Sequence, residues 1–278
     1  MSTTPKRLRI GFIGAGTIGS FLIDRIHQSP ELGMDVAIVA GRSERSKGRD
    51  GVRDRGINWT VDVIELLNAG IDVAVEAASH EALASAGVQC LARGIDLIPA
   101  SVGALVDNNL LAALRAAANA GGSIMHIPSG GIGGIDAVQA AALVGIDRVA
   151  MTINKTPKAW SNVPYVLRHG FNLEHLDEPL TIFDGPAREC VAEFPQDVNI
   201  AAVLSLAGIG FDRTHIKIVA HPTVTLNTYE IEWEGFTGRS RAVYENAFDP
   251  NNPKTTYLAA ISTLAALTRI RSSYRIGT

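Results

Sequence analysis

The sequence predicts an α/β fold, a doubly wound parallel sheet followed by a second, smaller α+β domain. Three observations predict it. In the first half, short apolar runs alternate with segments of helical periodicity. A glycine-rich stretch, Gly14–Gly19, stands between the first apolar run and the first helical segment. After about residue 130 the sequence pattern changes, and polar and apolar residues alternate as they do in half-buried strands.

The first domain is justified element by element. Segment 7–16 is a continuous apolar run that enters glycines, which suits a strand buried on both faces. Ile18, Leu22 and Ile26 give the next segment helical periodicity, and glycines or an Asp cap bound the later helices. The expected strands are 7–16, 34–42, 71–79, 95–101 and 123–131, and the expected helices are 17–29, 61–70, 80–94 and 107–122. This alternation is typical of a Rossmann-type sheet with right-handed crossovers.

The second domain is expected to combine strands of an antiparallel or mixed sheet with two Ala-rich helices. The expected strands are 147–155, 179–185, 215–222 and 225–235, and the expected helices are 198–208 and 255–270. No low-complexity linker separates the halves. We therefore expect a dinucleotide-binding domain over residues 1–128 and a substrate and dimerisation domain over 129–278.

Strand 225–235 has two distinct faces. Asn227, Tyr229, Ile231 and Trp233 share one face, and Thr228 and three glutamates share the other, which is expected to meet solvent. The first face begins polar and ends apolar. Asn227 and Tyr229 are therefore expected where the strand emerges from the core.

Composition excludes several classes of function. The 278-residue chain has a net charge of −3 and a pI near 6.2, so nothing attracts it to nucleic acid or anionic membrane. No apolar run approaches the roughly 18 residues of a membrane span, and no signal-peptide core precedes the first strand. Cys90 and Cys190 match no metal spacing, so we expect no metal site and a cytoplasmic protein with buried thiols.

The glycine-rich stretch predicts a dinucleotide site. Gly14, Gly16 and Gly19 form G-x-G-x-x-G between a strand and a helix, as the dinucleotide fingerprint requires. Gly14 permits a tight turn, Gly16 lets the backbone approach a pyrophosphate, and Gly19 lets helix and strand pack closely. The amides of Thr17 and Ile18, at the positive end of the helix, are expected to contact the phosphates.

The segment after the second strand favours NADP over NAD. Sites that prefer NAD usually place an acid there for the ribose 2′-hydroxyl, whereas this chain offers Arg42 and Ser43. An arginine suits a 2′-phosphate, although a solvated arginine that tolerates either cofactor remains the alternative. The ends of later strands, at Ala78–Ser79 and Ser101, are expected on the nicotinamide side.

Eight segments together resemble the L-aspartate dehydrogenase family over nearly the whole chain. They are GFIGAGTIG, VEAAS, SVGAL, IPSGGIGGIDAVQAA, NKTPKAW, FPQDVNIAAVLSLAGIGFDRT, LNTYEI and NPKTTYL. The resemblance implies a homodimeric enzyme that interconverts L-aspartate with oxaloacetate and ammonia through iminoaspartate, using NAD or NADP. It also implies that Gly131, commonly alanine in the family, and Asn199 contact the cofactor.

The same resemblance raises a question about catalysis. The family's catalytic histidine lies in an N-x-H-x-I motif, which here reads Asn227-Thr228-Tyr229-Glu230-Ile231. Asn227, Tyr229 and the upstream His221 are therefore the catalytic candidates. A phenol is a poor base near neutral pH unless a cation lowers its pKa, but it can donate a hydrogen bond to a carboxylate, an imine or an oxyanion.

Several alternatives remain open from the sequence. Tyr229 is either an active-site donor or a core tyrosine, and Lys155 either holds a carboxylate or is a surface lysine. His221, His80 and His126 are either functional or satisfied loop residues. The substrate is expected to be a small carboxylic acid, with aspartate as the default. The chain could instead reduce a different carbonyl or imine with Tyr229 as donor, or bind NAD(P) as a non-catalytic sensor.

Overall fold

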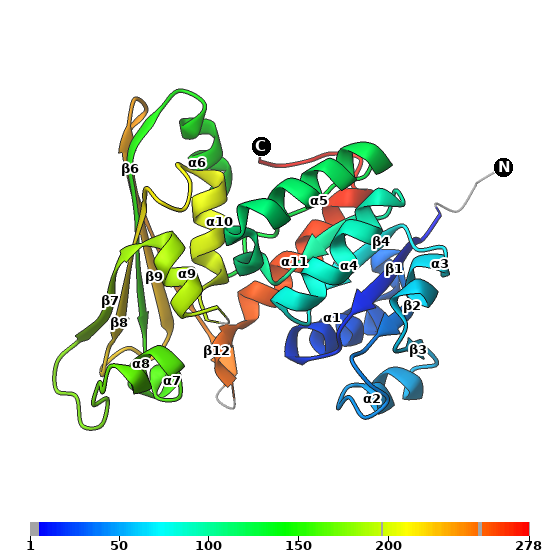
Figure 1. Cartoon of the computed structure of the whole chain (residues 1–278), viewed down its shortest axis with the longest axis horizontal. Helices are drawn as coiled ribbons and strands as arrows, with labels where there is room; N and C mark the ends of the chain where they lie inside the picture. Colours follow the sequence, from blue (N-terminus) through cyan, green and yellow to red (C-terminus); the bar gives the residue numbers. More distant parts are fainter. Residues whose placement is uncertain (1–5, 196, 250–251, 278) are drawn as a thin grey trace. The chain divides into compact units, whose positions relative to one another are not determined.

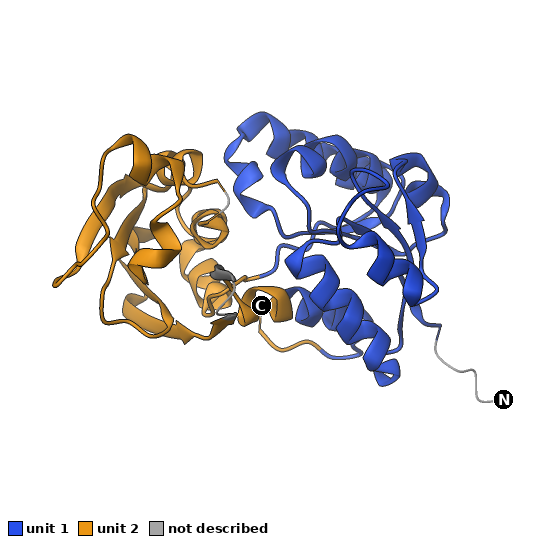
Figure 2. Cartoon of the chain, turned by 90° about the horizontal axis from the view of Figure 1, so that it is seen from below, with its two compact units in different colours: residues 1–128, 263–274 blue, residues 129–262, 275–278 orange. Residues whose placement is uncertain are grey.

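The computed structural model describes residues 6–195, 197–249 and 252–277 and folds into two compact units (Figures 1 and 2). Unit 1 comprises residues 1–128 and 263–274, and unit 2 comprises 129–262 and 275–278. The expected second domain took in the whole C-terminal segment. Residues 263–274 belong to unit 1 instead, because Leu267 is fully buried in the same hydrophobic cluster as Ile10 and Phe12.

Unit 1 is built on a five-stranded sheet in the order β3-β2-β1-β4-β5. Its strands are β1 (Leu8–Ile13), β2 (Met34–Ala40), β3 (Asn58–Thr60), β4 (Val73–Glu76) and β5 (Asp96–Pro99). Each neighbouring pair is parallel, so all five carboxyl ends meet at one edge. The predicted Rossmann-type sheet is confirmed, with β3 as a strand that the sequence pattern did not indicate.

Helices cover both faces of this sheet. They are α1 (Thr17–Gln28), α2 (Arg49–Asp54), α3 (Val63–Asn68), α4 (His80–Ala92) and α5 (Asn108–Gly121), with 3₁₀ turns at Pro30–Leu32 and Val102–Val106. On one face, Ile10 and Val73 share a cluster with Leu22 of α1. On the other, Leu97 of β5 lies against Gly87 of α4. The all-parallel order with two covered faces is the doubly wound arrangement.

Unit 2 contains a mixed sheet in the order β10-β9-β6-β8-β7. Its strands are β6 (Ile146–Lys155), β7 (Leu180–Pro186), β8 (Thr214–Ala220), β9 (Asn227–Gly235) and β10 (Gly238–Asn246), and β11 (Phe248–Asp249) pairs separately with β12 (Asn252–Thr256). Only the β6–β8 pairing is parallel among these five strands of the described chain. The expected mixed sheet is therefore confirmed.

Six helices accompany this sheet in the described residues. They are α6 (Ile135–Ala142), α7 (Pro157–Trp160), α8 (Pro164–Arg168), α9 (Ala187–Glu193), α10 (Asn199–Ala207) and α11 (Tyr257–Arg271), the last of which continues into unit 1. Gly208, after α10, lies close to Val138 of α6 and Val149 of β6, so both helices pack on the sheet. The two-faced reading of β9 is confirmed, since Asn227, Tyr229, Ile231 and Trp233 are its buried residues.

One local expectation was wrong, and a further strand was missed. Segment 123–131 is not a strand, because Met125 makes a single bridge to Leu97 before Pro128 and two glycines interrupt the pattern. Strand β10 was not expected, because Arg239, Arg241 and Glu245 make it a charged edge strand with a weak apolar pattern. Among the described residues, no helix combines the length and hydrophobicity needed to cross a bilayer.

Candidate functional site

The glycine loop of unit 1 leaves an open approach to the start of α1. Gly14 has φ +94°, a conformation that favours glycine, and a Cβ on Gly19 would lie 2.4 Å from the Gly14 carbonyl oxygen. At Gly16, by contrast, the nearest described atom to an added Cβ is Ala77 O at 3.9 Å. Gly16 is the N-cap of α1, and no described side chain caps the helix there. Gly16 and Thr17 are exposed, so the start of α1 faces open space that suits a pyrophosphate.

The segment after β2 packs closely on that loop. A Cβ on Gly48 would lie 2.3 Å from Ala15 O, so the two backbones are in direct contact. At the other end of the segment, Gly41 lies under the Trp59 ring, 2.0 Å from where its Cβ would be. Arg42 and Ser43 are exposed between these two fixed points. Sequence reasoning missed Gly41 and Gly48, whose only signal was a glycine at each end of a basic segment.

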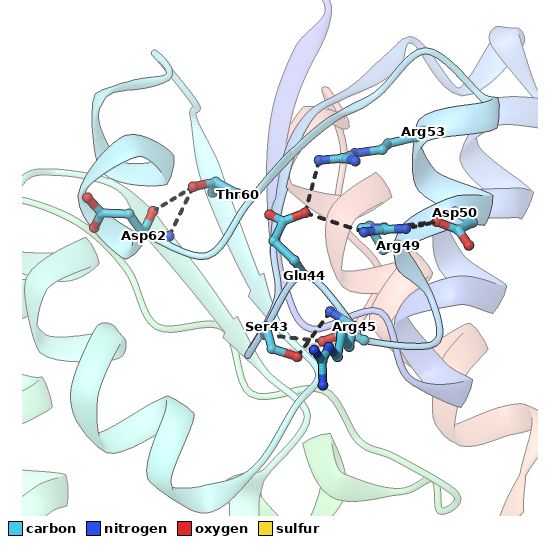
Figure 3. A network of polar contacts seen from close by, with 9 residues as sticks. Ser43, Glu44, Arg45, Arg49, Asp50, Arg53, Thr60 and Asp62 are labelled. Carbon is cyan, nitrogen blue, oxygen red and sulfur yellow. Dashed lines mark hydrogen bonds and ion pairs between the residues drawn. The ribbon is translucent and has the colours of Figure 1, made fainter.

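The acid nearest to Arg42 in this segment is held by arginines (Figure 3). Glu44 lies 3.1 Å from Arg53 and 3.6 Å from Arg49, which also binds Asp50. Ser43 turns back on itself, with its hydroxyl accepting the Arg45 amide hydrogen at 3.3 Å. The Glu44 carboxylate is thereby neutralised locally, which leaves the segment positive overall.

The ends of β4 and β5 meet at a buried carboxylate that the sequence analysis did not single out. Glu76 ends β4 and is fully buried, and its side chain accepts hydrogen bonds from Ala78, Ser79 and Ser101. Three expected cofactor-site residues are thus brought together by one acid. A glutamate that ends an apolar strand run was the available signal.

These features of unit 1 fit a dinucleotide. An added Cβ at Gly16 would occupy the open space above the helix start, and Gly14 and Gly19 are required by backbone conformation and packing. Gly16, Thr17, Ile18 and Gly19 would hold the pyrophosphate, and Arg42 and Ser43 flank the end of β2 where the adenine ribose would lie.

Unit 2 brings Asn227 and Tyr229 together with two cross-strand partners. Asn227 is fully buried and Tyr229 is 3% exposed, and they face Asn246 and Tyr244 in the β9–β10 register. Burial raises the pKa of Tyr229 well above its ordinary value, and a side-chain hydrogen bond with Asn227 lowers it by less. Tyr229 is therefore a neutral hydrogen-bond donor across the physiological pH range, not a base.

The loop before α6 lies directly on this pair. A Cβ on Gly131 would lie 3.2 Å from the Tyr229 ring, 3.3 Å from the Asn246 amide nitrogen and 3.0 Å from the Thr256 hydroxyl. The Asn246 amide also donates to Gly131 O. The absence of a side chain at Gly131 therefore gives the Tyr229 ring its room.

Asn199, the second expected cofactor contact, begins α10 near the same loop. A Cβ added at Gly130 would lie 3.2 Å from the side chain of Ile200, the second residue of α10. Gly130 N also donates to the Ser262 hydroxyl at 3.1 Å, which fixes the loop from its other side. Unit 2 therefore gathers Gly131, Tyr229 and the start of α10 around one glycine-rich loop.

Lys155 is buried, which excludes the surface-lysine alternative. It is 1% exposed, its ammonium donates to Asp197 O at 3.2 Å and it lies 4.7 Å from the centre of the Trp160 ring. Lys155 is therefore a buried cation beside the segment that leads into α10.

The histidine candidates are dispersed. His221 follows β8, its amide donates to Lys155 O at 2.9 Å, and its ring nitrogen lies 3.3 Å from the Thr223 hydroxyl. His126 binds Asp96 at 3.0 Å, at the amino end of β5, which is the edge opposite the glycine loop. His80 is the first residue of α4, after its cap Ser79. Of the three, only His221 belongs to the unit that contains Tyr229.

The described residues contain no cluster of metal-ligating side chains, and both thiols are buried. No group of three or more His, Cys, Asp or Glu side chains there could hold a metal ion. Cys90 and Cys190 are free and buried, as expected, and burial raises the pKa of the Cys90 thiol to about 11. Cys90 therefore stays a neutral thiol, which is a poor nucleophile.

Tyr229→Phe should flatten the loss of stability at alkaline pH. An unfolded tyrosine titrates near pH ~10, whereas the folded pKa of Tyr229 is higher. Above about pH 10 the unfolded chain therefore loses this proton first, and stability falls by up to about 1.4 kcal/mol per pH unit. Urea unfolding at several alkaline pH values measures the slope, with Tyr274→Phe, at a 72% exposed tyrosine, as the control. Equal slopes in wild type and Tyr229→Phe would contradict the buried neutral hydroxyl.

Both units match known families. Residues 14–128 match the homoserine dehydrogenase NAD binding domain, and residues 136–270 match the aspartate dehydrogenase C-terminal domain. The chain is 37% identical over 271 residues to the L-aspartate dehydrogenase of Methanosarcina acetivorans, an alignment that covers 98% of this chain and 100% of the relative. It is 36% identical over 260 residues to that of Ralstonia pickettii, covering 94% and 96%.

A solved structure supports the fold. The crystal structure of aspartate dehydrogenase from Thermotoga maritima matches with a TM-score of 0.73 and 22% identity, covering 98% of this chain and 100% of the other. The likeness extends through both units, so the combination of a parallel sheet and a mixed sheet is shared.

Proposed function

The chain belongs to the aspartate dehydrogenase family of NAD(P)-dependent oxidoreductases, and on this premise we propose that it interconverts L-aspartate and oxaloacetate. In one direction, aspartate loses a hydride to the oxidised cofactor and a proton, which gives iminoaspartate. Water then converts the imine to oxaloacetate and ammonia. The observation that carries the proposal is identity of 35–37% with L-aspartate dehydrogenases over nearly the whole chain.

We assign cofactor binding to unit 1 and substrate binding to unit 2. When bound, the cofactor supplies the hydride chemistry, and unit 1 holds it through the open glycine loop at Gly14–Gly19. Unit 2 contributes polar side chains on the face of β9. Its buried amide and phenol suit hydrogen bonds to a substrate whose position must be fixed for hydride transfer.

We propose that Tyr229 stands where the family has its catalytic histidine. A neutral phenol cannot take a proton near neutral pH, but it can donate to an imine nitrogen or to a carbonyl oxygen as charge develops. Asn227 orients it through their shared hydrogen bond. The proton acceptor must then be another group, and His221 is the candidate in unit 2, because an imidazole nitrogen can accept a proton.

A reductive assay tests the function. Purified protein, oxaloacetate, ammonium and NADPH should give L-aspartate with loss of reduced-cofactor absorbance, and omission of ammonium should abolish the reaction. The neutral Tyr229 donor also suits reduction of a different small carbonyl or imine, so the same assay should include a panel of keto acids. Turnover of another keto acid, with none of oxaloacetate, would favour this second function, and binding without any turnover would favour a sensor.

We expect NADPH to bind at least as well as NADH, because Arg42 is exposed at the end of β2 and Glu44 is held by Arg49 and Arg53. Arg42→Ala should weaken NADPH binding by about 1.5–3 kcal/mol, the value of a charged hydrogen bond to phosphate. NADH affinity should change little. Fluorescence titration of both reduced cofactors measures the effect, with Arg45→Ala as a neighbouring control. Unchanged NADPH affinity would rule out Arg42 as the phosphate ligand.

We further propose a homodimer assembled mainly through unit 2. The family resemblance motivates it, together with the Ala-rich helices and alternating strands of unit 2. Light scattering at micromolar concentration should give twice the chain mass of 29.5 kDa. A monomeric mass at that concentration would contradict the proposal.

A further inference from the structure

One side chain ties together the two loops that follow β4 and β5. Glu76 Oε1 accepts hydrogen bonds from Ala78 N at 2.8 Å, Ser79 N at 3.0 Å and the Ser101 hydroxyl at 3.0 Å. Glu76 Oε2 accepts from Ser101 N at 3.1 Å. The two loops are therefore cross-linked by a single carboxylate, in addition to the backbone bond from Ala100 N to Glu76 O at 2.7 Å.

The cost of burying this carboxylate indicates that the cross-link matters. Glu76 has no exposed surface, and burial raises its pKa, while the hydrogen bonds from Ala78, Ser101 and Ser79 act to lower it. An apolar residue would fill the same space in a parallel sheet without desolvation cost. What an apolar residue could not do is orient three backbone amides and a hydroxyl from two different loops.

The two loops lie at the end of the sheet where the nicotinamide half of a dinucleotide is expected. The end of β2 is where the adenine ribose lies in such sheets, and the glycine loop follows β1. In the order β3-β2-β1-β4-β5, the nicotinamide half therefore lies over the ends of β4 and β5. The β4 loop also contacts the glycine loop directly, since a Cβ on Gly14 would lie 2.7 Å from Ala78 Cβ and 2.9 Å from Ala77 O.

We propose that Glu76 is a positioning residue that fixes loops 77–79 and 100–101 as the surface on which the nicotinamide half of the cofactor rests. It acts through these loops and does not touch the cofactor. The proposal rests on the cofactor site in unit 1. It predicts that loss of the carboxylate weakens binding of the nicotinamide half and leaves binding of the adenine half unchanged.

Calorimetric titration of Glu76→Gln with two ligands tests this. One ligand is NADPH, and the other is 2′-phospho-ADP-ribose, which lacks the nicotinamide ring. In glutamine an NH2 group replaces one carboxylate oxygen. An NH2 group cannot accept hydrogen bonds, so the bonds from the backbone N–H groups of one of the two loops are lost. The Kd for NADPH should rise about tenfold, as expected for hydrogen bonds to a charged group. The Kd for 2′-phospho-ADP-ribose should change by less than about twofold.

Asp72→Asn is the matched control, because Asp72 lies just before β4, at the opposite end of the same strand. Its carboxylate accepts from Arg9 N at 2.9 Å and from the Lys6 ammonium at 2.8 Å. This variant should lower the unfolding temperature and leave both Kd values unchanged. Glu76→Asp, which keeps the charge but is one methylene too short to reach both loops, should reproduce the selective loss for NADPH.

Equal weakening of both ligands in Glu76→Gln would overturn the proposal, because the carboxylate would then support the fold alone. So would unchanged affinity for both, or a Glu76→Asp protein that cannot fold. Titration of the wild type with the same ligands comes first. A wild type that binds neither would refute the cofactor site itself, whereas a wild type that binds both isolates the role of Glu76.

Discussion

Gly16→Ala should fold with the thermal stability of the wild type and bind NADP(H) about a hundredfold more weakly, a loss of roughly 2.7 kcal/mol. The backbone at Gly16 has φ −75° and ψ −162°, which alanine adopts without strain. The nearest described atom to the added Cβ is 3.9 Å away, so nothing in the protein is displaced. The methyl group instead occupies the space through which the pyrophosphate must approach the helix start.

Gly14→Ala provides the contrast. Here φ is +94° and the new Cβ would lie 2.7 Å from Ala78 Cβ, so both stability and cofactor affinity should fall. Differential scanning calorimetry and cofactor titration measure the two quantities for both variants. If Gly16→Ala binds NADPH as the wild type does, the glycine loop is not the pyrophosphate site.

Tyr229→Phe should lower kcat for aspartate formation about a hundredfold while KM for NADPH changes little. The substitution keeps the ring that packs beneath Gly131 and removes only the hydroxyl. Loss of one donor to a developing charge typically costs about 10²–10³ in turnover. Steady-state kinetics measure the effect. Tyr244→Phe is the matched control, because Tyr244 pairs with Tyr229 across the β9–β10 ladder and its hydroxyl is bonded to the Gly133 backbone.

Tyr229→His extends the same test. If the surrounding groups still suit aspartate, an imidazole at this position should raise aspartate oxidation and move its pH optimum toward neutrality. Full activity in Tyr229→Phe, with the true substrate in hand, would show that Tyr229 is a core residue. His221→Ala would then be the next variant to examine for loss of turnover.

Site features that depend only on neighbouring residues could be predicted from the sequence. The glycine fingerprint and the alternation along β9 could both be predicted, because turn conformation and strand facing depend on neighbouring residues. The contacts of Glu76 could not, because Ser101 joins it from the loop that follows a different strand, β5. The burial of Lys155 was equally hidden, since its partners Asp197 and Trp160 come from other elements.

The misassigned elements have two kinds of cause. Segment 123–131 has the apolar character of a strand, but Pro128 and the two glycines after it interrupt the pattern, so it makes a single bridge at Met125. The placement of residues 263–274 in unit 1 depends on Leu267 packing into a core formed by residues 8–98, far earlier in the chain. Charged edge strands such as β10 show little apolar alternation, so only the pairing with β9 reveals them.

Transfer of deuterium from labelled NADPH into aspartate tests most directly whether the protein catalyses hydride transfer to iminoaspartate. The protein, oxaloacetate and ammonium are incubated with NADPH that carries deuterium on one or the other face of nicotinamide C4, and the amino acid formed is examined by mass spectrometry. We predict L-aspartate with one deuterium at Cα from one of the two labelled cofactors and unlabelled L-aspartate from the other. Absence of aspartate, or unlabelled aspartate from both, would contradict the proposed function.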